Sequence, residues 1–429
     1  MRFIIATLTL FLIVNQVQGQ DEWPAERDTS GLIGQWLFNE YCDSFPEIYM
    51  MPEWYDLQII YVQIDRDSSG FPHLTYHKMG VDNNRYFYPA SLVKLPTLLL
   101  TLEKLQELYP KYKIDKYSRI KIGKAHSCQK EFKTDTTGPE GYPTLANFIR
   151  RILLVSDNNA YSRLYEFMGQ EDLNKRMWAK GYTDNIILKR FARCDYEENR
   201  YTNPFWFYHL NGEVAYYQKA RKNPNKWIIP YKIDTRVGKG WLDWKTYRDK
   251  PKDFRYTNRI TLESELDMMI KLILPETVDS ADRWNISQHD RLFLLQYFSM
   301  YPRQSPIKEY HDYEEYEDSY KKYFMIGDTK DTIYDENLKI FNIVGLSYGF
   351  LSDIAYIVNL EEGVEFFLAA VIYTNHDDIL NNDKYEYHEV GFPFFGKFGR
   401  IVYEYERQRP RTYRPDFWEI KTALGLPPL

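Results

Sequence analysis

The stretch Tyr88-Pro89-Ala90-Ser91-Leu92-Val93-Lys94 decides the interpretation of this chain, because it opens an apolar helix predicted over residues 92–108. Ser91 and Lys94 are three residues apart, so they share one helical face and can touch. A serine hydroxyl is a poor nucleophile until a base takes its proton, and a lysine with a lowered pKa can be that base. Taken alone, however, Ser-x-x-Lys is common by chance. In most such cases the serine only caps the helix and the lysine is solvated.

A second polar motif, Val155-Ser156-Asp157-Asn158-Asn159-Ala160, follows a helix predicted over 144–155. Serine, aspartate and asparagine are frequent in turns between helices, so the motif also has a purely structural interpretation. Ser156 could instead pass a proton from Lys94 to a leaving group, and Asn158 could hold both Lys94 and a substrate amide. The two motifs together are much less frequent by chance than either is alone.

Strand-like runs stand at both ends of the chain, and helical patterns fill its middle. This order predicts an α/β (α+β) fold: one antiparallel sheet from both chain ends, flanked by helices, with an all-helical lobe inserted and a cleft between the lobes. The expected strands are 57–64, 73–79, 338–345, 349–359 and 364–374, and the expected helices are 92–108, 144–155, 171–180, 262–274 and 393–406.

An aromatic and basic insertion covers about 204–257 and is expected to form strands and loops. Its tryptophans could stack on sugars or cover the cleft as a lid. We favour the simpler interpretation that they form a small core holding the insertion in place. The tryptophans are Trp206, Trp227, Trp241 and Trp244.

Composition excludes several classes of protein. The 429 residues include 55 Lys and Arg against 61 Asp and Glu, a net charge of −6, which argues against a nucleic-acid-binding protein. Residues 1–19 resemble a signal peptide, with Arg2 before an apolar run. We therefore expect residues 20–429 to be an exported domain, periplasmic or extracellular, with no membrane span after the signal is removed, and a monomer.

Three cysteines, Cys42, Cys128 and Cys194, permit one disulfide and leave one thiol over. A domain of this size needs no disulfide to be stable, so we interpret the cysteines as incidental. No spacing of cysteine and histidine indicates zinc, and no metal or organic cofactor is expected.

The two motifs resemble those of the penicillin-recognising serine hydrolases, closest to the class A β-lactamase-like group and to a subgroup of uncharacterised exported serine hydrolases. The third motif of that family, Lys-Thr-Gly on an edge strand, is best matched by Ile343-Val344-Gly345-Leu346. The resemblance implies a β-lactamase/transpeptidase-like fold. It also implies that the Leu346 N–H, beside Gly345, pairs with that of Ser91 as an oxyanion hole.

Three departures from the family bear on function. Ile343-Val344 replaces the Lys-Thr pair that binds a substrate carboxylate, Ala192 falls where the deacylating glutamate is expected, and the insertion has no class A counterpart. Glu197 and Glu198 are near Ala192 but in an uncertain register. The sequence therefore predicts an exported serine hydrolase that acts through an acyl-enzyme on a β-lactam, a cell-wall peptide or a related amide or ester. The alternative is a weak or inactive binding protein that kept the fold.

Overall fold

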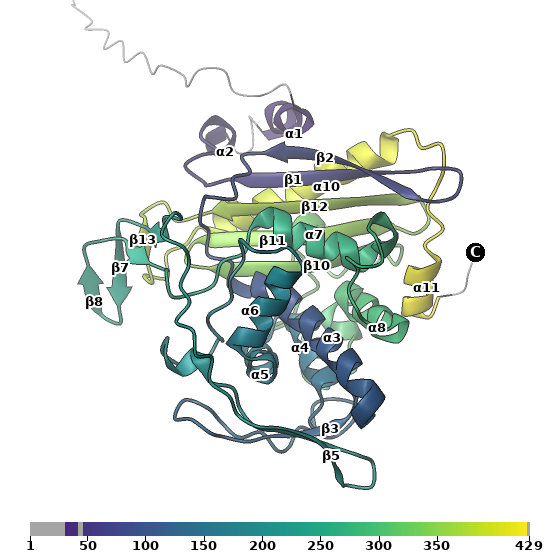
Figure 1. Ribbon diagram of the computed structural model, residues 1–429. Coiled ribbons are helices and arrows are strands. Elements are labelled where there is room, and N and C mark those ends of the chain that lie inside the picture. The colour runs from purple at the N-terminus through teal and green to yellow at the C-terminus, as the bar shows by residue number, and fades with distance from the viewer. Residues whose placement is uncertain (1–30, 42–45, 334, 427–429) are drawn as a thin grey trace, which may run out of the picture.

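The structure is a computed structural model that describes residues 31–41, 46–333 and 335–426. The predicted signal peptide and Cys42 lie outside the described residues. A five-stranded antiparallel sheet of order β10-β11-β12-β1-β2 joins strands from both ends of the chain (Figure 1). Its strands are β1 (Gln58–Arg66), β2 (Pro72–Met79), β10 (Leu338–Ser347), β11 (Phe350–Asn359) and β12 (Val364–Tyr373).

Apolar side chains cover both faces of this sheet, because its central strands alternate between two hydrophobic cores. Ile60 and Val62 of β1 belong to the core shared with the helical lobe. Ile59 and Tyr61 belong to the core beneath α10 (Phe392–Gln408) on the other face. The predicted sheet, built from both chain ends and covered by helices, is thereby confirmed.

Helices lie on both faces of the sheet, with α10 behind it and the helical lobe below and in front of it in Figure 1. The remaining helices are α1 (Leu32–Trp36), α2 (Pro46–Met50), α3 (Lys94–Tyr112), α4 (Leu145–Val155), α5 (Asn158–Met168), α6 (Gln170–Ala179), α7 (Leu262–Ile273), α8 (Gln288–Ser299), α9 (Tyr323–Ile326) and α11 (Trp418–Leu424). Besides α5 and α8, the short helices α1, α2, α9 and α11 were not predicted from the sequence. Short 3₁₀ turns are η2 (Ala90–Val93), η3 (Glu198–Arg200), η4 (Pro275–Thr277), η5 (Pro302–Gln304) and η6 (Lys308–His311), and π turns are η1 (Leu37–Tyr41) and η7 (Tyr387–Gly391).

The insertion forms small sheets, and one of them changes the expected lobe. Strand β3, which lies within the helical part of the sequence, pairs with β4 of the insertion, so the lobe carries a three-stranded sheet beside its helices. Strand β7 pairs with β13, which follows β12 in the chain and lies with β7 and β8 at one side of the main sheet (Figure 1). These strands are β3 (Arg119–Ile122), β4 (Phe205–Tyr208), β5 (Val214–Gln218), β6 (Arg236–Val237), β7 (Gly240–Asp243), β8 (Thr246–Arg248), β9 (Lys252–Asp253) and β13 (Ile379–Leu380).

The interpretation of the cysteines as incidental was wrong for two of them. Cys128 and Cys194 form a disulfide whose Cα atoms are 5.5 Å apart. The bond ties a loop after β3 to the loop that precedes η3, two irregular segments with few regular backbone hydrogen bonds of their own. No helix among the described residues is long and apolar enough to cross a membrane.

Candidate active site

Ser91 lies at the start of α3, in the short turn η2, and is half-buried in the wall of a cavity of about 540 Å³. Ala90 before it has φ +44°, a left-handed conformation that L-residues adopt at a cost. The Leu92 N–H donates to the Pro89 carbonyl and closes the turn. The backbone thus fixes the direction in which the Ser91 hydroxyl enters the cavity.

Lys94 is fully buried, and its amine meets the polar groups of both predicted motifs. The Lys94 Nζ lies within hydrogen-bonding distance of Ser91 Oγ at 2.7 Å, Ser156 Oγ at 2.9 Å and Asn158 Oδ1 at 2.8 Å. It also donates to the Ser156 carbonyl. Ser91, Lys94, Ser156 and Asn158, which the sequence had grouped, therefore lie together, and we call these four residues the lysine cluster.

The surroundings of Lys94 shift its amine toward the neutral form. Burial lowers the pKa of Lys94 well below its ordinary value, Asp157 opposes this shift, and the charge of Lys321 adds to it. A neutral amine has two N–H groups and one lone pair. The Ser156 carbonyl and Asn158 Oδ1 can only accept, so they take the two N–H groups and leave the lone pair for a hydroxyl. A neutral Lys94 amine could therefore accept a hydrogen bond from the Ser91 hydroxyl.

The second motif is a tight turn between α4 and α5. Ser156 ends α4 with φ +55°, in the left-handed region, and its N–H donates to the Ile152 carbonyl. Asp157 caps α5 by accepting the Ala160 N–H at 2.8 Å, and it pairs with Arg151 at 2.6 Å. The structural role and the site role of this motif thus coexist: Asp157 holds the turn, while Ser156 and Asn158 reach Lys94.

The third motif lies on β10, the edge strand of the sheet. A Cβ at Gly345 would lie 2.7 Å from the Pro89 carbonyl, so glycine allows β10 to approach the turn that carries Ser91. The two-residue turn Tyr348-Gly349 makes Ser347 and Phe350 the closing pair of the hairpin. Because the pairs of an antiparallel ladder alternate, the Leu346 N–H points away from β11, and Leu346 lines the cavity.

Ile343 and Val344, which stand where the family has Lys-Thr, face different sides of β10. Ile343 is fully buried in the core shared with the helical lobe, whereas Val344 lines the cavity. Neither side chain offers a charge or a hydroxyl to a ligand.

The loop expected to carry a deacylating carboxylate, residues 188–203, instead presents an aromatic ring to the lysine cluster. The Phe191 ring centroid lies 5.5 Å from Lys94 Nζ, and the ring packs on Tyr161. Glu197 pairs with Arg200 and Lys222, and Glu198 accepts from Ser127 at 2.7 Å. Both glutamates are thus engaged away from Lys94.

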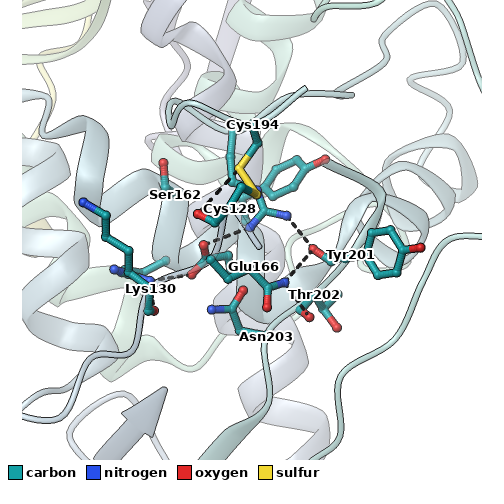
Figure 2. Close-up of polar contacts among 12 residues, drawn as sticks. Cys128, Lys130, Ser162, Glu166, Cys194, Tyr201, Thr202 and Asn203 are labelled. Carbon is teal, nitrogen blue, oxygen red and sulfur yellow. Dashed lines mark hydrogen bonds and ion pairs between the residues drawn. A yellow bond between two sulfur atoms is a disulfide. The ribbon is translucent and has the colours of Figure 1, made fainter. Parts of the chain in front are cut away.

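A buried polar network anchors the 188–203 loop (Figure 2). Arg190 is fully buried and donates to Glu166 on α5 at 2.9 Å. Figure 2 shows Glu166 at the centre of this network, with the Cys128–Cys194 disulfide above it. These contacts therefore give the loop a fixed conformation, although it lacks the expected glutamate.

One group of side chains among the described residues has the spacing of a metal site: His126, Cys128 and Glu198. The Cys128 sulfur is bonded to Cys194 and cannot act as a thiolate ligand. This group lies within the anchoring network of the 188–203 loop.

Sequence reasoning missed two features of the site. Lys321 lines the cavity although it is distant from every motif in sequence. Tyr88, Tyr348 and Phe254 form an aromatic cluster with ring centroids 4.9–5.1 Å apart, which joins the insertion to both the Ser91 turn and the β10 hairpin. The only sequence signal for the place of Lys321 in the cavity was the run Tyr320-Lys321-Lys322-Tyr323, and this signal is weak.

The tryptophans of the insertion are mostly structural. Trp227 packs on Trp178 at 4.7 Å, and Trp241 lies beneath Lys252 at 3.8 Å, so both support the interpretation as a local core. Trp244 is 85% exposed at the tip of the β7–β8 hairpin.

Comparison with known families supports the resemblance carried by the motifs. Residues 72–221 match the model of the β-lactamase enzyme family. The matched segment contains the whole lysine cluster and ends before β10. This confirms the predicted resemblance to a β-lactamase-like serine hydrolase family, and the match rests on the half of the site that follows the family pattern.

Several solved structures are similar over most of their length but at low identity. The β-lactamase from Sphaerobacter thermophilus is 12% identical with a TM-score of 0.43, covering 82% of this chain and 92% of its own. PBP-A is 13% identical with a TM-score of 0.43, covering 81% and 89%. A halotolerant bacterial β-lactamase is 14% identical with a TM-score of 0.41, covering 84% and 99%. No curated protein matches the chain.

Proposed function

We propose that this protein is a serine hydrolase that forms an acyl-enzyme at Ser91. The observation that carries the proposal is the contact of one buried amine, Lys94 Nζ, with Ser91 Oγ at 2.7 Å and Ser156 Oγ at 2.9 Å. A solvated helix-capping serine and a surface lysine would not share this arrangement. Acylation of Ser91 is the reaction that these groups can support.

The proposed acylation moves one proton through the lysine cluster. Lys94 takes the proton of Ser91 as Oγ attacks the carbonyl carbon of the substrate. When the C–N or C–O bond of the substrate breaks, Lys94 returns the proton through Ser156 to the leaving nitrogen or oxygen. Asn158, which is exposed to the cavity, orients the substrate and fixes the amine of Lys94.

The backbone N–H groups of Ser91 and Leu346 are proposed to bind the oxyanion. This role needs two donors aimed at one point, and Gly345 supports it by letting β10 approach the Ser91 turn. The donor at Leu346 depends on the strand and not on the side chain. It is therefore compatible with the loss of the Lys-Thr pair.

Deacylation is proposed to be slow. Hydrolysis of the acyl-enzyme needs a water activated by a base, and Phe191 offers no base beside Lys94. A long-lived acyl-enzyme is the behaviour of penicillin-binding proteins rather than of efficient β-lactamases. The proposed substrates are a β-lactam, a cell-wall peptide or a related amide or ester, met outside the cytoplasm if the predicted signal peptide is cleaved.

Labelling with a fluorescent penicillin and with a fluorophosphonate, followed by intact-mass analysis, tests this proposal. We expect a covalent adduct on Ser91 with at least one probe, and no adduct on Ser91→Ala. The Ser156→Ala variant should still be labelled, but more slowly, because the lysine cluster retains its base. Absence of any adduct on the folded wild-type protein would favour the alternative, a binding protein that kept the fold.

A further inference from the structure

The third motif leaves the site without its usual cation, and the cavity wall contains another. Ile343 and Val344 carry no charge, whereas Lys321 lines the same cavity as Ser91 and Ser156. Lys321 comes from the segment between η6 and α9, which is remote from both motifs in sequence.

Backbone carbonyls from two sides of the site hold the Lys321 amine. Its Nζ donates to the Leu153 carbonyl on α4, one turn before Ser156, and to the Asn342 carbonyl on β10 at 3.1 Å. The Asn342 side chain also donates to the Lys321 carbonyl at 2.7 Å. Lys321 is almost fully buried, and these hydrogen bonds hold its amine between α4 and β10.

We propose that Lys321 is the positioning cation of this site: its ammonium, held between α4 and β10 in the wall of the cavity that contains Ser91, acts on the Lys94 amine that takes the Ser91 proton. This inference rests on the proposed function. A buried positive charge disfavours a second one nearby, because the interior screens them little.

The titration of Lys321 sets the pH range of this effect. Burial lowers the pKa of Lys321 to about 7, and Asp353 opposes the shift. Lys321 is thus charged below about pH 7 and loses its influence above it. Lys322 and Asp353 are its buried neighbours. The other titratable groups that line the same cavity are Glu317, Tyr320, Tyr323, Asp328, Lys330, Tyr387 and His388. Among these, Asp328 is already paired with Arg400 at 2.6 Å.

The test is the rate of covalent labelling of Ser91 as a function of pH, measured with a fluorophosphonate that lacks a carboxylate and that phosphonylates the hydroxyl with loss of fluoride. In the wild type, the rate should rise with pH as Lys94 loses its proton. In Lys321→Met, the pKa of Lys94 rises, so the rate at about pH 6 should fall about tenfold, while the rates at about pH 9 should coincide. Lys321→Gln, which keeps an N–H donor for the carbonyls, should behave in the same way, and Lys321→Arg, which stays charged, should keep the wild-type rate at about pH 6.

Lys322→Met is the matched control. Lys322 is also fully buried and also donates to backbone carbonyls, those of Phe298 and Ile340, and to Asn342 Oδ1 at 3.0 Å, but it does not line the cavity. Its loss should lower stability and leave the labelling rate at about pH 6, the acid limb of the pH profile, unchanged.

Other outcomes separate the possible failures. An unchanged acid limb in folded Lys321→Gln overturns the inference. A loss confined to a carboxylate-bearing penicillin overturns it too, because Lys321 would then bind the substrate and not act on Lys94. If the wild type forms no adduct on Ser91 with either probe, the proposed function itself fails.

Discussion

The lysine cluster and the 188–203 loop lie on either side of the same amine, and they differ in what they offer it. The cluster surrounds Lys94 Nζ with oxygen atoms at 2.7–2.9 Å. The loop presents the Phe191 ring at 5.5 Å. One side thus has the groups that a nucleophile needs, and the other has none that could activate water.

This difference teaches that forming and releasing an acyl-enzyme depend on separate parts of the fold. The cluster is built by α3, α4 and α5, whose caps and packing would be needed in any case. The loop is held by Arg190, Glu166 and a disulfide, none of which contacts Ser91. The two sides share α5, but substitutions can remove side-chain contacts of one side and leave those of the other in place, as the predictions below do.

Lys94→Met should have the largest effect, because it removes the base and leaves Ser91 in place. We expect the rate of Ser91 labelling to fall about a thousandfold. In the wild type, the rate should fall as pH falls, since burial lowers the pKa of Lys94 and only the neutral amine can take the proton. The measurement is time-resolved intact mass with the probe that labels the wild type.

Lys104→Met is the control for this variant. Lys104 lies on the same helix, is also buried, and donates to the Phe167 carbonyl at 3.0 Å, outside the lysine cluster. Its replacement should cost stability but leave the labelling rate unchanged. Equal losses in the two variants would mean that Lys94 acts only by supporting the fold.

Glu166→Gln should weaken the ion pair that anchors the 188–203 loop. Glu166 accepts from Arg190 at 2.9 Å and from Arg163 at 2.8 Å, so the change leaves a buried guanidinium without its counter-charge. We expect a loss of about 3 kcal/mol in the free energy of unfolding, measured by urea denaturation. Glu171→Gln, which breaks an exposed pair with Lys175, should cost no more than about 0.5 kcal/mol.

Much of the cluster side could be predicted from the sequence, because its contacts are local or periodic. Ser91 and Lys94 meet through helical spacing, and the order of strands and helices indicated the sheet. What brings Ser156 to Lys94 is the packing of α5 on α3, and the sequence supported that contact only through the family resemblance.

The loop side could not be predicted, because its contacts are long-range and its backbone is irregular. Ala192 was expected at the position that faces the cluster, but its neighbour Phe191 packs on Tyr161 instead. No periodicity fixes the register of such a loop. Lys321 escaped notice for the same reason, since only the tertiary contact with Leu153 and Asn342 brings it to the cavity.

Removal of the disulfide should have a smaller effect than removal of the buried ion pair. The double variant Cys128→Ser/Cys194→Ser should lose about 2 kcal/mol of stability, because the unfolded chain is no longer cross-linked. Labelling of Ser91 should persist. Reductant should lower the Tm of the wild type and leave that of the double variant unchanged; an equal shift in both would assign the effect to another cause.

Phe191→Glu should give the 188–203 loop the base that it lacks beside the lysine cluster. The change places a carboxylate beside Lys94, where it could activate a water for attack on the acyl-enzyme. We expect deacylation to become about tenfold faster, a modest gain because the surrounding loop is not shaped to hold that water. The measurement is the half-life of the fluorescent penicillin adduct on Ser91 after free probe is removed.

Phe191→Leu separates the chemistry of the new carboxylate from the loss of the aromatic ring. Leucine also removes the contact with Tyr161 but brings no base, so the adduct should persist as it does in the wild type. If both variants shorten the half-life equally, the Phe191 ring protects the acyl-enzyme by excluding water. Slow release would then be a property of packing, and the difference between the two sides would lie in access rather than in a missing base.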